Sequence, residues 1–308
     1  MNLLAIFLWR RVYSTIMQRR LHPLEGIVAL FALFLVLALT VGFAQAGEVS
    51  GAPRAQKVVL LRSSAVLVQD ADTGEVVINK NSEAVVPIAS ITKLMTAMVL
   101  LDSGVDLSMR VVLAREDVDT FKGTRSRLRT GSVLTRDELL LLALMASENR
   151  AGAALGRTYP GGTPALVEAM NEKAAELEMT DSHFVDATGL SKRNVSSARD
   201  LAKLVRAAHS YPLIREYSTR DRATVTAFGR PLSFRNTNGL VRSSHWEIGL
   251  SKTGYISEAG RCLVMRVRLA SKDLIVVLLD SWGKHSRVGD ANRIKKWLEG
   301  HAAGQRSS

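Results

Sequence analysis

The chain has 308 residues, 47% of them hydrophobic, which suits one large domain or two small ones with a sizeable core. Its formal net charge of +12 admits nucleic acid, an anionic wall polymer or a membrane surface as a partner. The basic residues are spread along the chain without a run of five or six, which argues against nucleic acid. A lone cysteine, Cys262, excludes an internal disulfide, and its apolar neighbours indicate a buried strand position.

Residues 1–46 have the pattern of an export signal. Arginine pairs at 10–11 and 19–20 precede an apolar run over residues 26–43, and a small-x-small sequence ends at Ala46. We expect cleavage after Ala46. Because the apolar run has 18 residues, the lower limit for crossing a bilayer, an uncleaved anchor is the alternative. Both interpretations place the rest of the chain outside the cytoplasm.

The remaining chain divides into a linker, one domain and a tail. Residues 47–57 are small and polar, as in a linker, residues 58–300 form the domain, and residues 301–308 are expected to be frayed. At the start of the domain, short β-rich runs over residues 65–69 and 75–78 flank an Asp-Thr-Gly turn, which predicts a hairpin.

Four helices are predicted next. Residues 90–101 and 135–146 carry apolar residues with helical spacing, and Thr135 opens a Thr-x-x-Glu capping box. Pro164 is placed at the first position of the third helix, and Ser197 begins the fourth.

The last part of the chain is rich in strands. Residues 247–255, 261–269 and 274–280 predict three strands with short turns, which favour antiparallel pairing, and residues 291–299 predict a final helix. The first and last strands could share one sheet. The fold class is therefore α+β, with an antiparallel sheet flanked by helices.

A serine and a lysine three residues apart, Ser90 and Lys93, stand at the start of the first predicted helix. This spacing places both side chains on one face, where a neutral lysine could take the serine proton. Burial would lower the lysine pKa, and a second cation nearby, such as Lys252, would lower it further. The helix N-terminus would favour an oxyanion close to the serine. The alternative is a capping serine beside a solvated lysine, because Ser-x-x-Lys is common by chance.

Two further motifs follow. Ser147 and Asn149 lie where the second apolar helix ends, so that a hydroxyl and an amide can face one cleft; the alternative is an ordinary polar turn. Lys252 and Thr253 lie in a predicted strand, where they can hold a carboxylate. Gly254 lets another backbone approach, as an extended peptide docking on the strand edge requires; the alternative is a strand-end Thr-Gly.

Each motif alone is weak, but the three occur in order, 57 and 105 residues apart, each in a fitting structural context. The same set occurs in class A β-lactamases and penicillin-binding proteins. The six histidines are scattered and show no His-x₃-His pairing, so we expect neither a metal site nor a cofactor.

The chain resembles the serine D-Ala-D-Ala peptidases (peptidase family S11), the low-molecular-mass penicillin-binding proteins. The stretches that carry the resemblance are PIASITKLMTAMVLLDSG, LMASENRAGAALGRTYPGG, FVDATGLS and GLSKTGYISEAGRCLVM, within residues 58–298. The resemblance implies a β-lactamase/transpeptidase-like fold with an all-helical subdomain, in the periplasm. Carboxypeptidase members carry an additional β-rich C-terminal domain that this sequence lacks, which favours the D-alanyl-D-alanine endopeptidase type.

The resemblance also implies catalytic roles. Ser90 would attack a D-Ala carbonyl and form an acyl-enzyme, with Lys93 as general base. Ser147 would relay the proton to the leaving amine, and Asn149 would position the substrate.

Substrate-binding roles follow for the third motif. Lys252 and Thr253 would bind the carboxylate side of a peptidoglycan cross-link or of a β-lactam antibiotic, on the strand that contains Gly254. The N–H groups of Ser90 and Tyr255 would form the oxyanion hole.

Other activities stay open. A carboxypeptidase, a β-lactamase and a non-catalytic penicillin- or wall-binding module are the alternatives. Class A β-lactamases use a glutamate four residues before an asparagine to release the acyl group, and residues 183–194 contain none; Glu168 and Asn171 have the wrong spacing. We therefore expect a persistent penicilloyl-enzyme, with the role of Asp186 undetermined. Peripheral association with the membrane also stays open.

Overall fold

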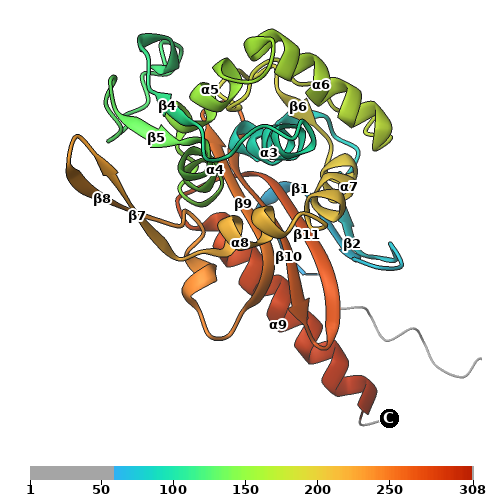
Figure 1. Cartoon of the computed structure of the whole chain (residues 1–308). Coiled ribbons are helices and arrows are strands. Elements are labelled where there is room, and N and C mark those ends of the chain that lie inside the picture. The colour runs from blue at the N-terminus through green and yellow to red at the C-terminus, as the bar shows by residue number, and fades with distance from the viewer. Residues whose placement is uncertain (1–58, 307–308) are drawn as a thin grey trace, which may run out of the picture. The chain divides into compact units, whose positions relative to one another are not determined.

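A five-stranded antiparallel sheet, in the order β2-β1-β11-β10-β9, organises the computed structural model, which describes residues 59–306 (Figure 1). The sheet combines the two ends of the domain: the hairpin β1–β2 from its start pairs, through β1 and β11, with the three strands from its end. The strands are β1 Ser63–Asp70, β2 Val76–Lys80, β9 Glu247–Ile256, β10 Gly260–Leu269 and β11 Lys272–Ser281. The predicted strands and the α+β class are confirmed.

Both faces of the sheet are covered, because alternate residues along each strand point to opposite faces and join two different core clusters. On β1, Ala65 and Leu67 join one core cluster, whereas Val66 and Val68 join a second. Helix α9 (Ser286–Arg306) covers the second face, and α7 (Ala198–Ala208) packs on the first (Figure 1). The sheet therefore forms the middle layer of this part of the chain.

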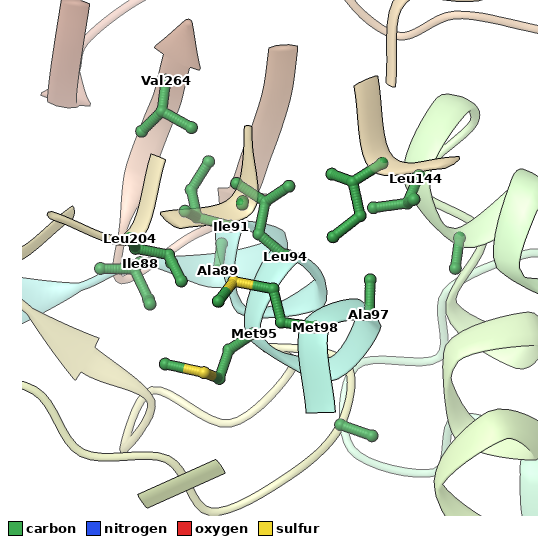
Figure 2. Packing of buried hydrophobic residues seen from close by; sticks show 14 of the residues in the cluster. Ile88, Ala89, Ile91, Leu94, Met95, Ala97, Met98, Leu144, Leu204 and Val264 are labelled. Atoms are coloured by element: carbon green, nitrogen blue, oxygen red, sulfur yellow. The ribbon is translucent and has the colours of Figure 1, made fainter. Parts of the chain in front are cut away.

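Helix α3 (Thr92–Asp102) lies at the centre of the helical region and is buried on every side. It contacts α4 (Arg136–Met145), α5 (Asn149–Arg157), α6 (Gly162–Glu176) and α7. Figure 2 shows its apolar side chains, Leu94, Met95 and Met98 among them, packed with Leu144, Leu204 and Val264 from surrounding elements. A lysine on such a helix cannot reach bulk water, which sets the chemistry of Lys93.

Helix starts are set mainly by caps that the sequence reveals. The Thr135 hydroxyl accepts the N–H of Glu138, whose carboxylate accepts the Thr135 N–H, so the capping box is confirmed. Ser197 likewise caps α7. The predicted start of the third helix was wrong. Gly161, with φ +83°, is the N-cap of α6, so Pro164 is its third residue, where a missing N–H also costs no helical hydrogen bond.

A hairpin that the sequence analysis missed lies between α8 (Pro212–Thr219) and β9. It consists of β7 (Arg222–Ala227) and β8 (Arg230–Arg235), joined by Phe228 and Gly229, both with positive φ. The Phe-Gly pair between two alternating segments was the available signal. Two shorter strand pairs complete the helical side: β3 Val86–Pro87 with β6 Val195–Ser196, and β4 Arg110–Val112 with β5 Val133–Thr135.

Helix α9 is longer than the predicted 291–299, and it continues to Arg306 through most of the segment that was expected to be frayed. The export signal and the linker lie outside the described residues. Among residues 59–306, no helix has the length and apolar character needed to cross a membrane.

Asp290 joins the start of β1 to α9. Its carboxylate accepts the N–H groups of Arg62 (3.0 Å) and Ser63 (2.7 Å) and the Ser63 hydroxyl (2.6 Å), and Arg293 pairs with it. Burial would raise the Asp290 pKa, but these hydrogen bonds hold it below the usual range. The carboxylate therefore stabilises the fold above the unfolded-state pKa, and this contribution is lost as the pH falls.

We expect Asp290→Asn to lower the free energy of unfolding by roughly 1–3 kcal/mol at pH 7, because buried N–H donors lose a charged acceptor. Urea denaturation would measure it, with the exposed Glu247→Gln as the matched control. The deficit should shrink as the pH falls below about 4, the ordinary Asp pKa, and should vanish below the lowered pKa of the native carboxylate. A deficit independent of pH would contradict this account.

Candidate active site

Ser90 lies in a 3₁₀ turn, Ala89–Ile91, directly before α3, so the helix starts two residues later than predicted. The turn is held from two sides by glycines. A Cβ on Gly189, which has φ +80°, would lie 1.9 Å from the Ala89 carbonyl oxygen, and one on Gly254 would lie 2.8 Å from the Ile88 oxygen. Gly254 does admit a close backbone, as expected, but in this structure it is the chain's own backbone beside Ser90.

Lys93 Nζ contacts three oxygens: Ser90 Oγ at 2.8 Å, Asn149 Oδ1 at 2.7 Å and the Thr188 carbonyl at 2.7 Å. The amide and backbone carbonyl oxygens can only accept hydrogen bonds. A neutral amine has two hydrogens and one lone pair. If the two hydrogens go to these carbonyls, the lone pair is left for the Ser90 hydroxyl. The arrangement therefore orients Lys93 as a base toward Ser90.

The pKa of Lys93 is lowered to about 7 by burial, and the carboxylates of Asp186 and Glu148 oppose part of this shift. Lys93 is only 1% exposed to solvent. Burial is thus the principal cause of the lowered pKa, as expected, and Lys252 is not among the main causes. A substantial fraction of Lys93 is neutral at physiological pH, as a general base requires.

Thr124 determines which end of the Asn149 amide faces Lys93. The Asn149 Nδ2 group donates to Thr124 Oγ1 (3.1 Å), and the Thr124 hydroxyl donates to Asp119 Oδ2 (2.7 Å). Because a carboxylate can only accept, the Thr124 proton is committed to Asp119, and its oxygen must accept from Asn149. The amide oxygen is thereby fixed toward Lys93. Sequence reasoning missed Thr124, which no motif marks.

Ser147 ends the turn after α4 in a left-handed conformation, with φ +57°. Lys252 Nζ donates to Ser147 Oγ (2.8 Å) and to the Thr253 carbonyl (3.0 Å). A non-glycine residue at positive φ is strained, and here the strain accompanies a side chain directed at the second lysine. The three motifs therefore meet at one site: Ser90 and Lys93, Ser147 and Asn149, and Lys252.

Lys252 is 1% exposed, and its pKa lies well below the usual value because of burial, with the charges of Lys93 and Arg287 adding to the effect. Arg287 Nη1 donates to the carbonyls of Gly254 (3.0 Å) and Cys262 (3.1 Å). No motif in the sequence marks Arg287, which reaches the site from α9. A substrate carboxylate beside Lys252 would favour its charged form.

β9 is the edge strand of the sheet, and its free edge borders the site. The Ser251 N–H bonds to Ser218 Oγ (3.3 Å), outside the sheet. In a strand, the N–H groups of every second residue point to the same side, and the pairing of β9 with β10 is regular from Ser251 onward. The N–H groups of Thr253 and Tyr255 therefore point off the same edge as that of Ser251. Thr253 Oγ1 also lies 2.6 Å from Thr237 Oγ1.

Asp186 acts on the site through its loop. Its carboxylate accepts hydrogen bonds from the N–H groups of Thr188, Gly189 and Ser191, the Thr188 hydroxyl and Asn194 Nδ2. Burial would raise the Asp186 pKa, but these bonds hold it below the usual range. The loop they order presents the Thr188 carbonyl to Lys93. Asp186, undetermined from sequence, is thus a positioning residue.

A cavity of about 350 Å³ opens on the helical side of the site, beside Asn149 and Thr188. Gly152 leaves space for the Lys93 side chain, because a Cβ at position 152 would lie 3.2 Å from Lys93 Cε. Within residues 59–306, no group of three or more His, Cys, Asp or Glu side chains is arranged to hold a metal ion. Cys262 is fully buried, and burial raises its pKa to about 11, which confirms its assignment as a core residue.

We expect Thr124→Val to slow acylation by a penicillin about tenfold, because one orienting hydrogen bond is lost and the Asn149 amide can turn. A turned amide presents Nδ2 to Lys93, which favours the neutral amine, so the acid limb of the pH–rate profile should move to lower pH. Stopped-flow acylation across pH 5–9 would measure both effects. Thr124→Ser keeps the hydroxyl and should behave as the wild type. An unchanged profile in the valine variant would refute the orienting role.

The comparisons with known proteins agree with this geometry. The peptidase S11 family model, described as D-alanyl-D-alanine carboxypeptidase, matches residues 52–283. A D-alanyl-D-alanine endopeptidase from Pseudomonas aeruginosa is 46% identical over 277 residues, covering 89% of this chain and 88% of its own length. One from Escherichia coli is 43% identical over 275 residues, covering 88% of each.

Solved structures show the same fold. A Streptomyces DD-transpeptidase matches with a TM-score of 0.72 at 25% identity, over 78% of this chain and 98% of its own. A D-alanyl-D-alanine carboxypeptidase from Mycobacterium tuberculosis matches in fold with a TM-score of 0.71 at 24% identity, over 80% of this chain and 95% of its own. By sequence and by fold, this chain belongs to the peptidase S11 family of serine D-alanyl-D-alanine peptidases.

Proposed function

We propose that this protein is a D-alanyl-D-alanine endopeptidase that hydrolyses D-Ala–diaminopimelate cross-links of peptidoglycan through an acyl-enzyme on Ser90. The single observation that carries the proposal is the contact of Ser90 Oγ with a buried, partly neutral Lys93 whose other two partners are acceptors. The names of two relatives above 40% identity support the endopeptidase assignment.

In the acylation step, Ser90 Oγ attacks the D-Ala carbonyl carbon while its proton passes to the Lys93 lone pair. The carbonyl oxygen becomes an oxyanion between the N–H groups of Ser90 and Tyr255. The outward direction of the Tyr255 N–H on the free edge of β9 supports this assignment. One such donor is typically worth about 10²–10³ in rate.

The leaving amine then needs a proton. We assign Ser147 as the relay, because its hydroxyl bonds to Lys252 and it lies two residues before Asn149, which contacts Lys93. The tetrahedral intermediate collapses as the C–N bond breaks, and the proton that Lys93 accepted reaches the amine nitrogen through Ser147. Lys252 and Thr253 hold the carboxylate of the departing arm, as a cation and a hydroxyl donor on the edge strand.

Deacylation by water is the slow step with penicillin. Asp186 is the carboxylate of the loop that lines the site, and its hydrogen bonds already engage both oxygens. A carboxylate so engaged is a poor general base. We therefore propose that the protein binds β-lactams covalently and releases them slowly, which argues against a β-lactamase.

We place the protein in the periplasm, where the cross-linked substrate lies. The export pattern of residues 1–46 supports this location, either as a cleaved signal or as an inner-membrane anchor facing the periplasm. D-Ala-D-Ala carboxypeptidase activity is the second candidate function, favoured by the description of the matching family model.

Acylation should require neutral Lys93. We therefore expect the rate of labelling by a fluorescent penicillin to rise about tenfold per pH unit below pH 7 and to level off above it, since the Lys93 pKa is about 7. Lys93→Ala should lower the rate roughly 10²–10⁴-fold with the fold intact by circular dichroism. Rapid labelling of this variant at neutral pH would exclude Lys93 as the base.

A digest decides the substrate class. The protein is incubated with cross-linked muropeptide dimers and, separately, with monomeric pentapeptide, and the products are separated by liquid chromatography. We expect dimers to be converted to monomers, and Ser90→Ala, the matched control, to leave them intact and to lose penicillin labelling. Release of free D-Ala with untouched dimers would reverse the ranking in favour of the carboxypeptidase.

A further inference from the structure

Another cavity, of about 200 Å³, lies where the end of β9, the start of β10 and the end of β11 meet the connection to α9. Tyr255 and Ser257 line it from β9 and the following turn, Arg261 from β10, and Trp282 and Lys284 from the connection to α9. Tyr255 is also the residue whose N–H points toward the reaction centre. Tyr255 therefore links the edge strand to the cavity.

The cavity carries unneutralised positive charge. Among residues 59–306, no carboxylate lies within ion-pair distance of Arg261 or Lys284, and Arg287 lies close enough that the Arg261 charge depresses its pKa. Glu258 in the nearby turn is paired with Lys122. Asp280 pairs with neither cation, but its Oδ1 lies beside Gly260, which also lines the cavity, so two cations face one nearby carboxylate. The cavity is therefore suited to an anion.

Two aromatic side chains form walls for the same cavity. Trp282 is 77% exposed and Tyr255 is 57% exposed, which is unusual for large apolar side chains. The Arg261 guanidinium stacks over the Tyr255 ring at 4.6 Å from its centroid. Stacking holds this cation in place beside the strand edge and leaves its N–H groups available. An aliphatic arm that ends in a carboxylate would match these walls and charges.

The direction of the substrate determines which arm arrives here. In the proposed function, Lys252 and Thr253 hold the departing arm, and the scissile carbonyl lies between the Ser90 and Tyr255 N–H groups. A peptide extended along β9 then continues on its acyl-donor side past Tyr255 toward Ser257. The donor arm, rather than the leaving arm, reaches the basic cavity.

We propose that this cavity is a recognition subsite for a free carboxylate on the acyl-donor arm of the peptide, with Arg261 and Lys284 as its cationic partners and Trp282 as its wall. The proposal rests on the proposed function, because it takes the orientation of the substrate from it. It adds a determinant of specificity that discriminates stem peptides by the charge of the residue preceding the reactive D-Ala.

The test uses two synthetic thioester substrates that end in D-Ala and differ only in the preceding side chain, which carries a carboxylate or the corresponding carboxamide. A thioester reports acylation whichever leaving arm the enzyme prefers. We expect wild-type protein to favour the carboxylate about tenfold in kcat/KM, and added salt to reduce the preference. Lys284→Ala and Arg261→Gln should each reduce it several-fold, and Lys284→Glu should abolish or reverse it.

Controls separate this subsite from the active site. Lys284→Arg should keep the preference, and Lys272→Ala, at the opposite end of the sheet, should keep the wild-type ratio. Equal kcat/KM for the two substrates in wild-type protein, or a ratio that survives Lys284→Glu, would overturn the subsite while leaving the proposed function standing. Failure of both thioesters and of penicillin to acylate Ser90 would overturn the proposed function itself.

Discussion

The buried amine of Lys93 is the constraint on which the rest of the site depends. A lysine in the interior is costly as an isolated cation, so it needs acceptors for its hydrogens and a lowered pKa. Asn149 and the Thr188 carbonyl provide the acceptors. Each is held in turn: Thr124 orients the amide, and Asp186 orders the loop of Thr188. The lone pair of the neutral amine is then directed at the Ser90 hydroxyl.

A second buried lysine makes the arrangement more demanding. Lys252 lies near enough to Lys93 for the Lys93 charge to depress its pKa, and Arg287 adds to the local positive charge. Two amines and a guanidinium close together disfavour the charged state until an anion arrives. This suits a site whose substrate carries carboxylates, since binding the substrate supplies the missing charge. The strain at Ser147 is of the same kind, a local cost retained at a functional position.

Local signals in the sequence predicted most helices and strands, but the residues at which some of them begin and end could not be predicted. The capping residues Thr135 and Ser197 specify helix starts through bonds to their own neighbours, so they could be recognised. The start of α6 could not, because Gly161 adopts a left-handed cap and Pro164 is tolerated anywhere in the first turn. Helix α9 packs on the sheet through Ala291, Ile294 and Leu298, and its helical backbone continues to Arg306 beyond this apolar segment.

The sequence by itself determined the chemistry: a serine and lysine one turn apart, two further motifs in order, and enough family resemblance to name the reaction. These are properties of residue type and spacing, which a chain shows without folding. Only the tertiary structure decided how the chemistry is controlled. Thr188 lies 95 residues from Lys93, and Thr124 lies 25 from Asn149. Which hydrogen bonds orient an amine, and which cations of residues 59–306 line a cavity without an ion-pair partner, depend on distances that only the folded chain establishes.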